Sequence, residues 1–145
     1  MIATKTIKKA VYDLLKRKFA LPVYFDEVIE SISKPCFFVA LEQEYSVESV
    51  ETMFRQLTIT ITYYQEEASE ADKIQKQTDL AALFMPIFAV DDRQLTVESI
   101  TGSIYGSLID VMDFDVMINF YDTLQTVATH DLMQNIKIKT QKGGD

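Results

Sequence analysis

Residues 53–64 read MFRQLTITITYY, and apolar and polar side chains alternate along them almost residue by residue. A period of two is typical of a β-strand that buries one face of its sheet. One face would carry the odd positions from Met53 to Tyr63, which are apolar except for Arg55 near the outer end. The other face would carry three threonines, which favour strands and still tolerate water. A usual strand has about 5–6 residues, so this stretch predicts an unusually long strand with one buried face.

Residues 109–121, IDVMDFDVMINFY, repeat the same pattern. The even positions from Met112 to Phe120 are apolar and form a continuous core face. The odd positions include Asp113, Asp115 and Asn119, which suit a face that meets water or a neighbouring subunit. We therefore expect a second long strand that shares the core with the first.

A helix is predicted over residues 4–20, because apolar side chains recur there at steps of three and four and make one stripe. Thr4 or Thr6 can cap its first turn, and Pro22 prevents its continuation. The basic residues fall mainly off the apolar stripe, which indicates an amphipathic helix that lies on a sheet.

A second helix is predicted between the two long strands, from Ser69 through Phe88. Ser69 followed three residues later by Asp72 resembles a capping box with aspartate in the place of glutamate. Pro86 marks either the final turn of this helix or a kink in it.

The rest of the chain predicts shorter strands, joined by turns. We expect these strands at residues 23–25, 36–41, 94–101 and 133–139. Residues 42–51 are either a hairpin connection or an exposed loop, Asp91–Asp92 is a turn, and Gly102 and Gly106 suggest a bend or bulge. The order of elements predicts an α+β fold, a mainly antiparallel sheet with two helices packed on one face. It would form a single domain over residues 1–145, of which about 140–145 would be a flexible tail.

Composition fits a folded cytosolic protein. The chain has 145 residues, 48% of them hydrophobic, and its single cysteine, Cys36, lies in an apolar run and is expected to be a buried thiol. No apolar segment is long enough to span a membrane, and no secretory signal follows the first lysines. The net charge of −8 is uneven: residues 1–20 carry +5, residues 21–136 carry −15 and residues 137–145 carry +2. Such an acidic body is a poor nucleic-acid binder over most of its surface.

The sequence contains few groups that could form a catalytic or metal site. His130 is the single histidine, so neither a zinc site nor a histidine-based triad has the partners it needs. Asp113 and Asp115 share a strand face, but no histidine or glycine-rich phosphate loop accompanies them. We therefore predict no catalytic residues, no metal and no cofactor, and hence a protein that is not an enzyme.

Three segments together resemble phage tail terminator (tail completion) proteins. These are TIKKAVYDLLKRKF at residues 6–19, RQLTITITYYQ at 55–65 and LIDVMDFDVMINFY at 108–121. The resemblance covers residues 3–122. Within the family, the chain is most similar to the small terminators of contractile-tailed phages, prophages and tailocins of Gram-positive bacteria. It implies a tail-terminator-like fold and a structural virion protein.

In that family the protein forms a sixfold ring on the last ring of the tail tube. The resemblance therefore implies a homo-hexamer that stops tube and sheath polymerisation and docks the head or neck, or closes a headless particle as a collar. Its partners would be further copies of itself, the tube protein, the sheath protein and a head–tail connector or neck protein. DNA would only pass through the lumen, and no membrane would be involved. Assembly would occur in the bacterial host cytoplasm, at the head-proximal end of the tail.

A ring needs surfaces that complement each other between subunits. Basic residues of the first helix are expected to meet acidic residues and a tyrosine of the next subunit's loop: Lys8, Lys9, Lys16 and Arg17 with Glu42, Glu44, Tyr45 and Glu48. Two alternatives stay open, another head–tail connector or minor tail protein, and a small intracellular binding module.

Overall fold

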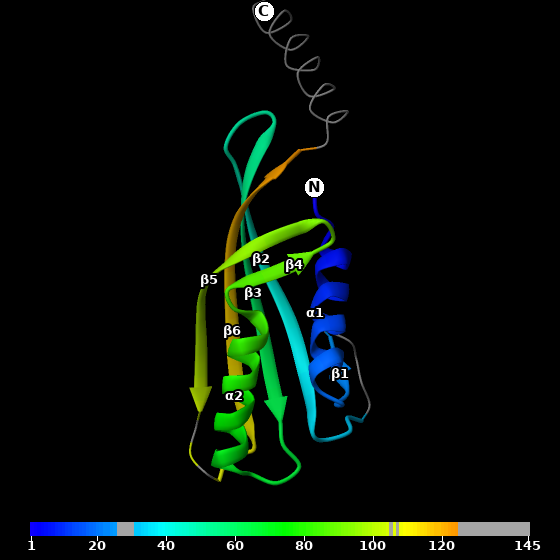
Figure 1. The fold of residues 1–145 in the computed structure, drawn as a ribbon, viewed down its shortest axis with the longest axis vertical. Coiled ribbons are helices and arrows are strands. Elements are labelled where there is room, and N and C mark those ends of the chain that lie inside the picture. The colour runs from blue at the N-terminus through cyan, green and yellow to red at the C-terminus, as the bar shows by residue number, and fades with distance from the viewer. Residues whose placement is uncertain (26–30, 105, 107, 125–145) are drawn as a thin grey trace, which may run out of the picture.

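The computed structural model describes residues 1–25, 31–104, 106 and 108–124. Two helices and a six-stranded, mostly antiparallel sheet make up this part of the chain, as the sequence predicts. The elements in chain order are α1 (Thr4–Lys18), β1 (Val23–Tyr24), β2 (Cys36–Val47), β3 (Thr52–Tyr64), α2 (Glu70–Phe84), β4 (Ile87–Val90), β5 (Arg93–Ile104) and β6 (Val111–Thr123). The strands lie in the order β1-β2-β3-β6-β5-β4, and β1 alone runs parallel to its neighbour (Figure 1).

Strands β3 and β6 form the centre of the sheet and confirm both predicted long strands. They pair antiparallel without interruption from Thr52–Thr123 to Tyr64–Val111. Odd positions of β3 and even positions of β6 point to the same side, as predicted, and build the core with the helices. The fully buried members include Leu57, Ile59 and Ile61 on β3 and Met112, Phe114, Val116 and Ile118 on β6.

Both helices cover one face of the sheet, as expected (Figure 1). Ile7, Val11 and Leu15 form the buried stripe of α1. The predicted threonine cap of α1 is wrong, because Ala3 occupies the N-cap position and no side chain caps the first turn. The expected capping box of α2 is half present: the Ser69 hydroxyl accepts a hydrogen bond from the Asp72 amide at 3.3 Å.

The chain beyond α2 differs from the expected helix end. α2 stops at Phe84, before Pro86, and Ile87 already begins β4. The irregularity in β5 lies between Val97 and Ser99, not at a glycine. Residues 93–96 of β5 pair with β4, whereas Val97 and the residues from Ser99 to Ile104 pair with β6. In Figure 1 the β4–β5 hairpin crosses the helix-bearing side of the sheet next to α1.

The strand β2 is longer than predicted, Cys36–Val47 in place of 36–41, and it pairs with β3 along its whole length. Residues 42–47 therefore belong to β2 and residues 48–51 connect it to β3, which corresponds to the first of the two expected possibilities, a hairpin connection. Cys36 is buried as expected, and burial raises the pKa of its thiol although Lys34 nearby opposes this. Across the described residues, neither helix has the length and apolar character to cross a membrane. The expected strand at 133–139, the tail at 140–145 and His130 lie outside the described residues.

The two-residue turn at Asp91–Asp92 joins β4 to β5, as expected, and it gives a stability prediction. Asp91 has φ of 56°, in the left-handed region that glycine adopts without steric cost. We expect Asp91→Gly to raise the free energy of unfolding by about 0.5–1 kcal/mol, measured by urea unfolding. Asp92→Gly is the matched control and is expected to lower stability, because it adds chain entropy without relieving a positive φ. A loss of stability in both variants would contradict this account.

Candidate assembly surfaces

The four basic residues predicted to form one interface patch lie on different sides of α1. Lys9 and Arg17 border a hollow between α1 and β4, and Lys9 pairs with Asp13 at 2.8 Å. Lys8 faces away from this hollow, with its ammonium group 5.5 Å from the centre of the Phe25 ring. The structure thus does not bring the predicted basic set together on one side.

The Lys16 ammonium group has its own intramolecular contact, a hydrogen bond of 3.2 Å to the carbonyl of Leu21. Asp13 raises the pKa of Lys9, first through the hydrogen bond and then through its charge. Of the four predicted residues, Lys9 and Arg17 are the two that border the hollow.

The acidic half of the predicted patch is divided as well. Glu42 and Glu44 are exposed on the sheet face opposite the helices, in register with Thr58 and Gln56 of β3. Tyr45 points to the helix side, where its hydroxyl donates to the Gln43 side chain at 3.0 Å and the guanidinium of Arg55 lies 4.9 Å from its ring.

Glu48 sits at the turn of the β2–β3 hairpin. The turn is closed by hydrogen bonds of 3.0 Å from the amides of Glu48 and Ser49 to the carbonyl of Thr52. We define the hairpin tip as residues 44–52, which project beyond the ends of the helices in Figure 1. Among its exposed side chains are Tyr45, Val47 and Val50.

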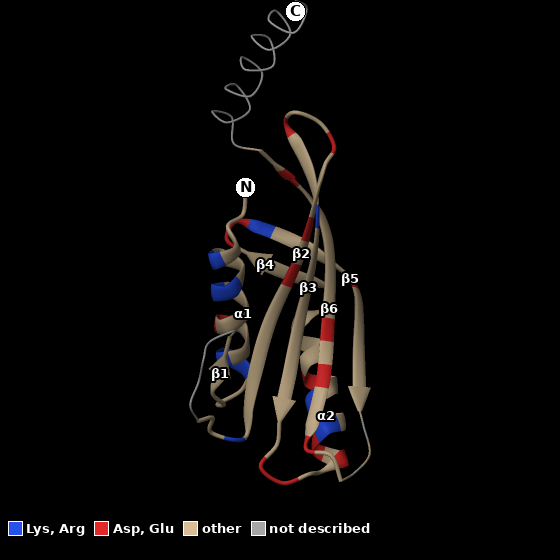
Figure 2. Cartoon of the chain, turned by 180° about the vertical axis from the view of Figure 1, so that it is seen from behind, with Lys and Arg blue, Asp and Glu red and all other residues tan. Residues whose placement is uncertain are grey.

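The sheet face opposite the helices is open and acidic. Figure 2 shows β2, β3 and β6 across this face, with acidic residues on β2 and β6. Its register places Thr60 beside Asp115 and Thr62 beside Asp113, and the Thr62 hydroxyl lies 3.1 Å from an Asp113 carboxylate oxygen. Within β2, β3 and β6 the one basic residue is Arg55, whose side chain lies on the other face. The described part of the chain holds no group of three or more residues placed to bind a metal ion.

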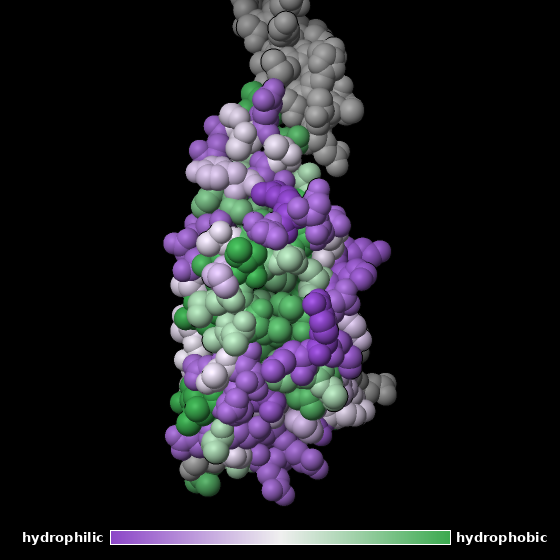
Figure 3. All heavy atoms as spheres, viewed as in Figure 1, coloured by the Kyte–Doolittle hydropathy of each residue, from purple (hydrophilic) through white to green (hydrophobic). Residues whose placement is uncertain are grey.

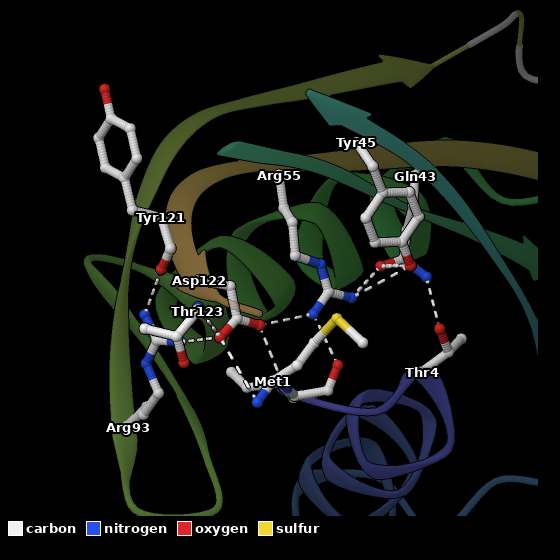
Figure 4. Close-up of polar contacts among 10 residues, drawn as sticks. Met1, Thr4, Gln43, Tyr45, Arg55, Arg93, Tyr121, Asp122 and Thr123 are labelled. Carbon is white, nitrogen blue, oxygen red and sulfur yellow. Dashed lines mark hydrogen bonds and ion pairs between the residues drawn. The ribbon is translucent and has the colours of Figure 1, made fainter. Parts of the chain in front are cut away.

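A buried ion network joins the start of α1 to the sheet at the base of the hairpin tip (Figure 4). Arg55 on β3 and Asp122 on β6 pair at 2.9 Å, and both side chains are at most 3% exposed. Arg55 also donates to the Ile2 carbonyl at 2.6 Å and to Gln43, whose amide in turn donates to Thr4 at 2.8 Å.

Asp122 is the centre of this network. Its carboxylate accepts hydrogen bonds from the amide of Ile2 at 2.8 Å, from Arg55, from Arg93 at 3.1 Å and from the amide of Thr123 at 2.9 Å. Burial opposes ionisation of the carboxyl group, but these donors and the nearby Met1 amino group outweigh it, so the pKa of Asp122 lies below its ordinary value. The network fixes α1, the β4–β5 hairpin and the hairpin tip relative to one another.

From the sequence, Arg55 was expected to interrupt the apolar face near the outer end of the strand, where a charged side chain can reach water, and Asp122 was not identified as a site residue. The alternation itself could have identified the pair. Arg55 is at an odd position, on the core face of the first alternating stretch, and Asp122 is at an even position, in line with the core face of the second. When two long strands are known to be neighbours, a basic residue and an acidic residue at core-facing positions predict a buried ion pair.

A second polar cluster holds the start of α2 against β3. The Tyr63 hydroxyl donates to Asp72 at 2.6 Å, and Gln65 and Lys76 bind the same carboxylate at 2.9 and 3.1 Å. Burial and then Asp72 raise the pKa of Tyr63. Burial of Asp72 acts against its ionisation, but the bonds from Tyr63, Gln65 and Lys76 prevail and lower its pKa.

The lowered pKa of Asp72 and Asp122 predicts how stability depends on pH. A carboxyl group with a folded pKa below its unfolded value of about 4 stabilises the fold above pH 4, and this contribution is lost as pH falls through the folded pKa. We expect the free energy of unfolding to fall as pH is lowered from about 5 to about 2, and to fall less steeply in Asp72→Asn. Urea unfolding at several pH values measures this. Identical slopes in the wild type and Asp72→Asn would contradict it, and Tyr63→Phe should give an intermediate slope.

Comparison with known proteins tests the resemblance noted from the sequence. The sequence profile of the family described as phage tail terminator protein matches residues 6–130, most of the chain. A search of curated proteins gave no match. The match covers α1 from its third residue, α2 and every strand from β1 to β6, so it applies to nearly all of the described fold. The chain therefore belongs to the phage tail terminator protein family, whose members are structural components of phage tails.

Proposed function

We propose that the protein caps the head-proximal end of the tail tube as a sixfold ring. In this position it stops tube and sheath polymerisation and offers the surface to which the head or neck docks, or it closes a headless particle as a collar. The match to the tail terminator family over residues 6–130 carries this proposal. Assembly takes place in the bacterial host cytoplasm.

The shape and charge of the subunit support a ring. α1 carries six basic residues and one acidic residue, whereas the hairpin tip carries three acidic residues and no basic one. These are two different surfaces of one subunit, so contact between them joins copies head to tail, and such contacts close into a ring when the rotation between copies allows it. Charge complementarity of this kind steers association and fixes register.

The open sheet face supports a role in lining the lumen. Glu42, Glu44, Asp113 and Asp115 lie on this face, and β2, β3 and β6 present no lysine or arginine there. Phosphate binding to proteins depends on neutralisation by lysine and arginine. A lumen lined by this face lets DNA pass without adhering to it.

Electron cryomicroscopy of purified tails tests the proposal. We expect one sixfold ring of this chain at the head-proximal end, in contact with the last ring of the tube. The chain found along the tube, or at the distal end, would contradict the proposal.

The predicted basic surface of α1 can be tested in the same particles. We expect the triple variant Lys8→Glu, Lys9→Glu and Arg17→Glu to be lost from tail ends, because all three side chains are exposed and their reversal leaves the core intact. Lys34→Glu, at the opposite end of the sheet near Asp110, is the control for a charge reversal away from α1. Intact rings in the triple variant would exclude α1 from the subunit interface.

A further inference from the structure

An apolar hollow lies between α1 and the β4 strand. Its volume is about 420 Å³, and its floor consists of half-buried or exposed aliphatic side chains: Ala10, Leu14, Leu83, Ile87 and Ala89. Polar residues of α1 and the β4–β5 turn form its rim, including Arg17 and Asp91. Figure 3 shows hydrophobic atoms gathered on this side of the molecule with hydrophilic atoms around them. We call this hollow the α1–β4 groove.

The hairpin tip has the opposite shape and matching chemistry. Val47 is 78% exposed, Tyr45 50% and Val50 37%, so three side chains expose apolar surface at one end of the molecule. The turn that carries them is ordered by its own hydrogen bonds, since the Ser49 hydroxyl accepts from the amides of Glu51 and Thr52 at 3.2 and 3.1 Å. Little order has to be gained when such a turn binds a partner. Large exposed apolar side chains grouped together mark an interaction site.

Charge also matches the two surfaces. The tip contains Glu44, Glu48 and Glu51 and no basic residue, a net charge of −3 over residues 44–52. The helix that borders the groove has a net charge of +5 over residues 4–18, and its Lys9 and Arg17 line the groove together with Asp13 and Asp91. Opposite net charges on the helix and the tip steer the approach of the two surfaces, and apolar contact then forms the centre of the interface.

We propose that the hairpin tip of one copy inserts into the α1–β4 groove of the next copy. The tip cannot enter its own groove, because β2 and β3 carry it away from α1 beyond the end of the helix (Figure 1). The contact is therefore between two different surfaces of neighbouring copies, as a head-to-tail ring requires. This inference rests on the proposed ring and specifies which parts of the subunit close it.

Cysteine cross-linking in assembled tails tests the contact. The double variant Val47→Cys with Ile87→Cys places one thiol on the tip and one in the groove, and both positions are exposed, so the fold is retained. The natural Cys36 is buried and stays unreactive. Purified tails would be treated with a short bis-maleimide and analysed on a denaturing gel with an antibody to this chain. We expect a ladder of linked copies that ends at the closed ring.

Matched controls separate the possible failures. Each single variant should give at most dimers, and Val47→Cys with Lys34→Cys should give no ladder, because Lys34 lies near Asp110 and does not line the groove. Monomers alone from the double variant, in tails that contain it, would overturn the groove contact and leave the proposed function standing. Absence of the wild-type chain from purified tails would overturn the proposed function itself. Exclusion of Val47→Cys or Ile87→Cys from tails that accept Lys34→Cys would support the contact, since each position would then be needed for incorporation.

Discussion

Asp122→Asn is expected to lower the free energy of unfolding by about 3–5 kcal/mol. The substitution keeps the shape of the side chain but removes the charge that balances Arg55, which is 1% exposed. A buried charge that loses its partner keeps its full desolvation cost, and this cost exceeds the value of the original pair. Arg93 and the amide of Ile2 lose the same acceptor charge, so the start of α1 and the β4–β5 hairpin are loosened together. Urea unfolding followed by circular dichroism measures the effect.

Asp115→Asn is the matched control for this experiment. It lies on the same strand, but on the open face opposite the helices. We expect it to change stability by no more than about 0.5 kcal/mol. Similar losses of stability in Asp122→Asn and Asp115→Asn would show that Asp122 does not stabilise the fold through its buried pair with Arg55.

A double variant distinguishes the pair from the individual residues. Arg55→Met with Asp122→Asn removes both charges and puts an apolar side chain in the place of the unpaired guanidinium, so it should be more stable than Asp122→Asn alone. Additive losses in the double variant would contradict the coupling described here.

The second large effect is expected from Phe114→Ala, which should cost about 3–5 kcal/mol. Phe114 is fully buried on the central strand β6, directly opposite Ile61 on β3 and Gly102 on β5. Gly102 has no side chain of its own, and the side chain of Gln77 from α2 lies over this position. Removal of the Phe114 ring leaves a cavity in the core, and this costs stability because the surrounding structure relaxes only in part. Met117→Ala, on the open face of the same strand, is the control and should cost less than about 1 kcal/mol. Equal costs would mean that the core does not lie on the helix side of the sheet.

Much of the fold could be predicted from local pattern. The alternation in residues 53–64 and 109–121 identified the two central strands and the face that each buries. The end of β2 could not be found in this way, because its outer residues from Glu42 onward are mostly exposed on both faces and show no buried period. The irregularity in β5 at Val97/Ser99 depends on which strand each part can pair with, which local sequence does not contain.

The candidate surfaces were predicted in part. The sign of the charge on each surface and its exposure could be predicted from the sequence. Helical geometry alone separates Lys8 from Arg17, since a rotation of 100° per residue puts them on different sides of α1. Glu42 and Tyr45 differ by an odd number of positions on one strand, so they must face opposite ways. The α1–β4 groove required the tertiary fold, because β4 was expected to be the end of a helix.

Deletion of the gene from its phage, followed by electron microscopy of the lysate, tests the central claim most directly. The protein is proposed to end tail growth and to prepare the tail for the head. We therefore expect tails of abnormal length, or tails that stay unjoined beside filled heads, with normal particles restored by the wild-type gene supplied in trans. Tails of normal length attached to heads in the deletion lysate would contradict the account.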